Sequence, residues 1–247
     1  MKKLMLFLII VSISSCSGQP VKDVHKAAEK RLQLGLEYMK FGHNEMAMDR
    51  LQKALELDEN YADAHNALAV LFERLEQNDK AKEHYQKALA IEPQNSDIQN
   101  NYGQFLCKQG QAKEADRHFL IAVKNGLYKT LEIPYTNAGK CALRNKQPKK
   151  AEAYFQKALQ ANSEFTLALY HLAEINYDNR NYVKAQDYLN RYLRDGLHTP
   201  KTLWLGVRIA QALNDSKTEA NYKRLLRSPP YQDSEEAKLL ERLDNNE

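Results

Sequence analysis

Apolar side chains recur along the chain at the three- and four-residue spacing of amphipathic helices, as Leu51, Ala54 and Leu55 illustrate. Residues that break helices separate these apolar stripes, for example at Gly42, at Gly110 and near Pro148. No stretch shows a convincing alternation of apolar and polar residues with a period of two, which a half-buried strand would need. The pattern therefore predicts an all-α chain.

A longer period is superimposed on the helical one. A small residue recurs as Gly35, Ala69, Gly103, Gly139 and Ala173, at separations of 34, 34, 36 and 34 residues. An alanine stands twelve residues after each small residue, and four residues later follows a large apolar one: Leu51, Tyr85, Phe119, Phe155 or Leu189. This period and this alternation of small and large residues resemble the tetratricopeptide repeat, which folds as two antiparallel helices.

The resemblance predicts a tetratricopeptide-repeat solenoid of about six helix hairpins over residues 27–229. The expected repeats cover residues 28–61, 62–95, 96–131, 132–165 and 166–199, followed by a degenerate unit at 200–229. The two extra residues between the third and fourth repeats are expected to bend the stack or to lengthen one loop. Residues 230–247 are predicted to form a C-terminal helix and tail.

The first residues have the features of an export signal. Lys2 and Lys3 precede an apolar run at residues 4–11, which is far shorter than the roughly 20 residues needed to cross a bilayer. The segment Ile13-Ser14-Ser15-Cys16 resembles the bacterial lipobox, in which the cysteine becomes the lipidated first residue of the mature chain. The alternative is a plain secretory signal with an incidental cysteine.

On the lipobox interpretation, residues 1–15 are a signal peptide, Cys16 is the lipidation site and residues 16–26 are a lipid-anchored segment. Acyl chains on Cys16 would hold the protein on a membrane. Ser17 and Gly18 lack the aspartate that signals inner-membrane retention in lipoproteins. The resemblance therefore implies a lipid-anchored protein on the periplasmic face of the outer membrane.

Charge and motif content narrow the class of function. The 36 basic and 32 acidic residues give a formal charge of +4, and no block of like charge supplies the stripe that nucleic-acid binding needs. The sequence contains no spacing typical of metal ligands, no phosphate loop and no nucleophile motif. We therefore expect a binding protein and not an enzyme, with no metal and no cofactor. His84 and His118, which are 34 residues apart, are expected on a solvated outer face.

Three cysteines are too few for a disulfide framework. Apart from Cys16, Cys107 and Cys141 fall on the predicted first helices of adjacent repeats. Cys107 lies four residues after Gly103, whereas Cys141 lies two residues after Gly139, so their registers differ. The sequence is therefore compatible with two alternatives, a disulfide and a pair of buried free thiols.

Repeat solenoids bind partners along their concave face. At the inward positions of first helices in tetratricopeptide proteins, the first repeat carries the apolar residues Leu32, Leu36 and Met39. Alternatively, these three side chains are buried inside the protein, either covered by residues 21–30 or packed against the rest of the first repeat. Later repeats place asparagines at or beside the inward positions: Asn66, Asn100, Asn101 and Asn137. We expect the apolar residues of the first repeat to anchor a peptide at one end of the solenoid. Farther along the solenoid, we expect the asparagines to form hydrogen bonds with the peptide backbone.

A series of cations stands five residues after the small residue of each of the first four repeats: Lys40, Arg74, Lys108 and Arg144. Cations at the end of a helix stabilise the negative end of its dipole, by about 0.3–1 kcal/mol each. The same cations could instead recognise an acidic ligand, and the sequence leaves both interpretations open.

The combination of features resembles one family more closely than the repeat class alone. A lipobox followed by six tetratricopeptide units is the layout of the PilF/PilW pilotins, the type IV pilus biogenesis lipoproteins. The similar segments cover nearly the whole chain and include residues 34–38, 63–72, 100–105 and, in the degenerate last unit, 203–210. The family implies an outer-membrane adaptor that binds the pilus secretin and promotes its localisation and multimerisation. The alternative is a lipid-anchored scaffold for other envelope partners, such as cell-wall hydrolases or outer-membrane assembly factors.

Overall fold

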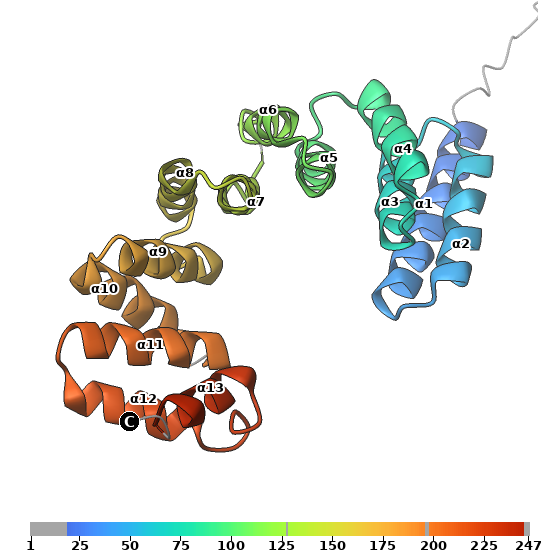
Figure 1. The fold of residues 1–247 in the computed structure, drawn as a ribbon. Helices are drawn as coiled ribbons and strands as arrows, with labels where there is room; N and C mark the ends of the chain where they lie inside the picture. The colour runs from blue at the N-terminus through green and yellow to red at the C-terminus, as the bar shows by residue number, and fades with distance from the viewer. Residues whose placement is uncertain (1–18, 127, 196–197, 245–247) are drawn as a thin grey trace, which may run out of the picture. The chain divides into compact units, whose positions relative to one another are not determined.

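The computed structural model describes residues 19–126, 128–195 and 198–244, and the predicted signal peptide and lipidation site lie outside these ranges. The described residues hold thirteen α-helices, one short 3₁₀ helix and no strand, which confirms the expected all-α fold class. They divide into two compact units, the first ending at Pro93 and the second starting at Gln94 (Figure 1).

The first unit consists of two helix hairpins that pack on each other through α2 and α3. Its helices are α1 (Gln19–Lys40), α2 (Asn44–Leu57), α3 (Ala62–Arg74) and α4 (Asn78–Ile91).

The second unit contains four further hairpins and a C-terminal helix. Its helices are α5 (Ser96–Lys108), α6 (Ala112–Ala122), α7 (Glu132–Arg144), α8 (Pro148–Ala161), α9 (Thr166–Asp178), α10 (Tyr182–Tyr192), the 3₁₀ helix η1 (Leu193–Asp195), α11 (Pro200–Ala212), α12 (Ser216–Leu226) and α13 (Glu235–Asp244). The second helix of each hairpin contacts the first helix of the next within this unit.

The hairpins are closed by one recurring turn. Its central residue has a positive φ in every hairpin: Gly42, Glu76, Gly110, Lys146, Arg180 and Asn214, with φ between 56° and 79°. The next backbone N–H donates to a carbonyl five residues earlier, as Gln77 does to Phe72 at 2.9 Å and Gln147 to Ala142 at 2.9 Å. This is the Schellman arrangement, which satisfies the last carbonyls of a helix.

Small residues of the repeat allow the two helices of a hairpin to approach closely. A Cβ added at Gly103 would lie 2.8 Å from the Phe119 ring, and one added at Gly139 would lie 2.7 Å from the Phe155 ring. Phe119 and Phe155 are themselves buried, so the large residue fills the space that the glycine leaves. The alternation read from the sequence is thus a pairwise contact between helices.

The two extra residues lengthen a loop. The connection between α6 and α7 spans residues 123–131, whereas the corresponding connection between α8 and α9 spans only residues 162–165. The loop is tied back to the start of its own repeat, because the Tyr128 hydroxyl donates to the Asp97 carboxylate at 2.8 Å.

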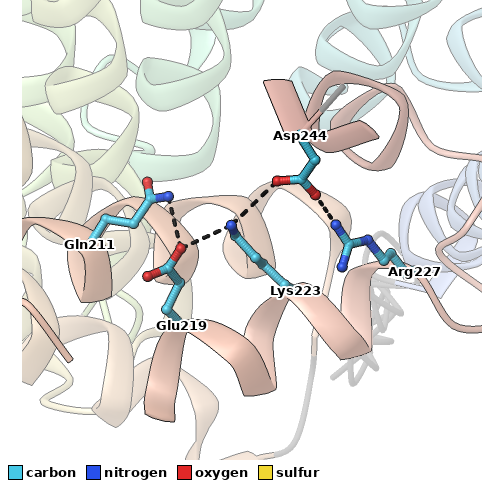
Figure 2. A network of polar contacts seen from close by, with 5 residues as sticks. All are labelled: Gln211, Glu219, Lys223, Arg227 and Asp244. Carbon is cyan, nitrogen blue, oxygen red and sulfur yellow. Dashed lines mark hydrogen bonds and ion pairs between the residues drawn. The ribbon is translucent and has the colours of Figure 1, made fainter. Parts of the chain in front are cut away.

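The C-terminal helix α13 is fastened to the last hairpin by apolar and polar contacts. Ala237 and Leu240 are buried in the same cluster as Leu203 and Leu226. Figure 2 shows the polar network, in which Lys223 lies between Glu219, at 3.0 Å, and Asp244, at 3.5 Å. Arg227 pairs with the same Asp244 carboxylate, and the Gln211 amide donates to Glu219 at 2.9 Å. The network connects α11, α12 and α13, so this helix covers the last hairpin.

Candidate partner-binding site

The three apolar candidates of the first repeat occupy different environments. Leu32 and Met39 are buried in the first unit, where α1 packs against α2 and α3, so ordinary packing accounts for their apolar character. Leu36 is 39% exposed. Of the three residues, only Leu36 therefore offers its side chain to a partner, and binding there stays a prediction.

Two further apolar side chains are exposed beside the first hairpin turn. Phe41, directly after α1, is 70% exposed, and Met46, in the first turn of α2, is 45% exposed. We call Leu36, Phe41 and Met46 the first-repeat apolar residues. The sequence could have identified Phe41 and Met46 by their position. They flank the helix-breaking residues 42–44, and the buried apolar face of a helix ends at such a turn.

The asparagine candidates are arranged by side-chain hydrogen bonds. Asn100 is buried in α5, and its Oδ1 accepts a hydrogen bond from Nδ2 of Asn137 in α7 at 2.9 Å. Asn137 therefore pairs with Asn100, although Asn101 is the residue that lies one repeat length of 36 residues before it. Asn101 and Asn137 are half-buried in the second unit, and Asn66 is half-buried in α3 of the first unit. Hydrogen bonding of these residues to a peptide backbone stays a prediction.

The cation series divides into two environments. Nη1 of Arg74 donates to the Met39 carbonyl at the end of α1 and lies 3.5 Å from Oδ1 of Asn44. Arg74 thus compensates the exposed carbonyls of the preceding first helix, as a helix-end cation should. Lys40 is exposed at the end of the same helix, in its last turn. Lys108 and Arg144, in contrast, line a pocket of the second unit.

This pocket has a volume of about 210 Å³ and lies between α5 and α7. We call it the α5–α7 pocket, and it is lined by Gln104, Cys107, Lys108, Phe119, Asn137, Lys140, Cys141 and Arg144. Cys107 and Cys141 form a disulfide in its wall, with their Cα atoms 5.8 Å apart. Of the two alternatives left open by the sequence, the structure has the disulfide.

The histidine expectation was wrong. His84 is half-buried, with its ring 5.3 Å from that of Phe72 and its Nδ1 3.0 Å from Nδ1 of His65. His118 packs edge-on against Tyr102 at 4.7 Å. Burial lowers the pKa of His84 to about 4, with a further contribution from His65, and burial also lowers the pKa values of His65 and His118. These imidazoles are therefore neutral packing groups at pH 7.

Metal-ligand clusters and membrane-spanning helices are both absent from the described residues. No three histidine, cysteine, aspartate or glutamate side chains in these ranges come together in a way that could hold a metal ion. No helix in the same ranges is long and apolar enough to cross a membrane. Two features of the described residues that offer a ligand something to bind are the first-repeat apolar residues and the α5–α7 pocket.

Family models and known proteins match the chain along most of its length. Models described as TPR repeat or tetratricopeptide repeat match residues 35–76, 62–95, 84–117 and 142–200. The type IV pilus assembly protein PilF of Pseudomonas aeruginosa is 36% identical over 225 residues, covering 88% of this chain and 89% of PilF.

Solved structures give the same result. A structure of Pseudomonas aeruginosa PilF superposes with a TM-score of 0.80 at 35% identity, covering 89% of this chain and 98% of that one. The crystal structure of PilW, described as a widely conserved type IV pilus biogenesis factor, superposes with a TM-score of 0.77 at 30% identity, covering 86% and 97%. The similarity therefore extends over nearly the full length of both relatives.

Proposed function

The chain belongs to the PilF/PilW family of type IV pilus biogenesis proteins, and we propose on that basis that it is a pilotin. In this role it is a lipid-anchored, non-enzymatic adaptor that binds the pilus secretin and promotes secretin localisation and multimerisation in the outer membrane. The observation that carries the proposal is the near full-length match to PilF, at 36% identity over 88% of this chain. A repeat match alone would support only a binding scaffold.

The proposed anchor is Cys16, which is separated from α1 by two residues and lies outside the described residues. A lipid anchor so close to the first hairpin would hold the repeats at the periplasmic face of the outer membrane. A secretin segment bound to those repeats would then have a high effective concentration near its site of insertion. The protein would thus act by placing its partner, without making or breaking a bond.

The proposed secretin contact is formed by the first-repeat apolar residues. Leu36, Phe41 and Met46 are exposed apolar side chains within eleven consecutive residues. A group of exposed apolar side chains so close together is typical of a surface that binds a partner. Aromatic and methionine side chains are enriched in the buried cores of protein interfaces. An apolar segment of the secretin is the ligand that these residues would accept.

The experiment for the proposed function compares heat-resistant secretin multimers in a deletion strain complemented with wild-type or Cys16→Ala protein. The proposal expects multimers with the wild-type protein, none with the empty deletion strain, and a large loss from the outer-membrane fraction with Cys16→Ala. Unchanged multimers in the deletion strain would contradict the secretin role and favour the scaffold for other envelope partners. Normal outer-membrane multimers with Cys16→Ala would contradict the anchor while leaving the repeats as the active part.

A further inference from the structure

We propose that the α5–α7 pocket is a second binding site, which takes a carboxylate group from an acidic peptide segment of a protein partner. The carboxylate is that of an aspartate or glutamate side chain or of a chain end. The site belongs to the second unit and shares no residue with the first-repeat apolar residues. It does not depend on which protein those apolar residues bind.

The lining of the pocket is positively charged. Three of the eight lining residues are cations, Lys108, Lys140 and Arg144, and none is an aspartate or glutamate. Lys140 and Arg144 are four residues apart on α7, a spacing at which like charges repel each other and destabilise a helix. An anion bound between them would attract both cations and so offset this repulsion.

The side chains of the two α7 cations are not engaged within the described part of the protein. Among the described residues, neither the Lys140 nor the Arg144 side chain forms a hydrogen bond or an ion pair. Lys150, one helix further on the same hairpin, shows the contrast, because it pairs with Asp116 at 2.9 Å. The side chains of Lys140 and Arg144 are therefore available to a ligand.

The disulfide fixes the spacing of the cations. Lys108 directly follows Cys107 in α5, and Lys140 directly precedes Cys141 in α7. The bond between the two cysteines therefore holds the backbone of both lysines at one separation before any ligand arrives. A site that is already ordered loses less entropy on binding.

The remaining lining residues favour a peptide over other anions. Cys107, Cys141 and Phe119 are buried apolar residues that can contact the carbon atoms of a side chain. The amides of Gln104 and Asn137 can hydrogen-bond to a peptide backbone, and Asn137 is oriented by its 2.9 Å bond to Asn100. The volume of about 210 Å³ is below the roughly 300–1,000 Å³ of pockets that hold whole small-molecule ligands. It suits one side chain or one chain end.

The test uses the full chain purified in detergent micelles and a fluorescein-labelled peptide of ten glutamates, with a peptide of ten glutamines as the uncharged comparison. Fluorescence anisotropy at low salt should show binding of the glutamate peptide only. The double variant Lys140→Gln/Arg144→Gln should weaken that binding at least tenfold. The matched control, Lys146→Gln/Lys149→Gln, removes the same charge from exposed positions outside the pocket and should change the affinity less than twofold.

Two further arms distinguish the alternatives. Cys107→Ser/Cys141→Ser should weaken glutamate-peptide binding severalfold while circular dichroism shows that the helices persist. Vesicles of phosphatidylglycerol should bind wild-type protein and the Lys140→Gln/Arg144→Gln variant equally. The proposal is overturned if the glutamate peptide does not bind, if both double charge variants weaken binding alike, or if Lys140 and Arg144 are needed for the vesicles and not for the peptide.

Discussion

The ring of Phe155 lies where a side chain on Gly139 would have to stand, with a Cβ at Gly139 only 2.7 Å from Cε1 of the ring. The two residues come from α7 and α8, and their contact sets how closely that hairpin closes. The fifth repeat carries Ala173 and Leu189 at the same two positions, so an alanine and a leucine can occupy them together.

We predict that Gly139→Ala destabilises the protein because overpacking a close contact costs about 1–3 kcal/mol. This cost opposes the gain of about 0.5–1 kcal/mol from replacing a helical glycine by alanine. In a Phe155→Leu background the same Gly139→Ala change should cost at least about 1 kcal/mol less, and urea unfolding of the four proteins measures the difference. Equal costs in the two backgrounds would show that the contact does not determine the hairpin spacing.

The hairpin turns give a prediction of the opposite sign. Lys146 and Arg180 adopt φ values of 57° and 61°, in the left-handed region that non-glycine residues enter at a cost of roughly 1–2 kcal/mol. Gly42 and Gly110 fill the same place in other hairpins. Lys146→Gly should therefore raise the midpoint of urea unfolding, whereas Lys149→Gly, in the first turn of α8, should lower it. A lower midpoint for Lys146→Gly would contradict the turn assignment.

Acid should weaken the first unit through its histidine pair. The pKa of His84 lies at about 4 in the folded protein, well below the roughly 6.5 of an exposed histidine, because the ring is buried and faces His65. Between these two values the unfolded chain binds more protons than the folded one, so stability falls as the pH is lowered from about 6.5 to about 4. His84→Gln should flatten this part of the curve of unfolding free energy against pH.

The control for the acid prediction is Gln86→Ala, at an exposed residue of α4 that carries no titratable group, and it should leave the slope unchanged. Lys87 and Glu83 also act on His84, the lysine lowering its pKa and the glutamate raising it. A slope that is the same in wild-type protein and in His84→Gln would show that the buried pair does not titrate on unfolding.

The disulfide should contribute to stability as well as to the pocket. It closes a segment whose ends are 34 residues apart, and cross-links of this length stabilise proteins by about 3–4 kcal/mol when they restrict the unfolded chain. We expect Cys107→Ala/Cys141→Ala to lower the unfolding free energy by that order. A loss below 1 kcal/mol in the double variant would contradict this prediction.

The repeat pattern was enough to predict the helices and their pairing, because a 34-residue alternation of small and large residues describes a contact between two helices. It could not separate Leu36 from Leu32 and Met39, since periodicity identifies apolar positions without saying which neighbouring helix covers them. The burial of Leu32 and Met39 follows from the packing of α1 against α2 and α3, which are separate elements in the sequence.

The α5–α7 pocket is a second feature that the sequence pattern did not predict. The cation series identified Lys108 and Arg144 but not Lys140, because Lys140 does not recur at the repeat period. The different registers of Cys107 and Cys141 left their pairing open, although the structure brings their Cα atoms to 5.8 Å. In each case the deciding fact is the separation of two helices, which the spacing of residues along the sequence does not give.

The central claim is that the first-repeat apolar residues bind the secretin, and its most direct test is co-purification of secretin with protein variants from the native host. Leu36→Glu/Phe41→Glu places two charges on exposed positions, so the fold should persist while the apolar contact is lost. Val183→Glu changes an apolar residue of the second unit that is 72% exposed and serves as the matched control. We predict that secretin is retained by wild-type protein and by Val183→Glu and is reduced at least tenfold with Leu36→Glu/Phe41→Glu. Full retention by the double variant, with its helical content unchanged, would contradict the claim.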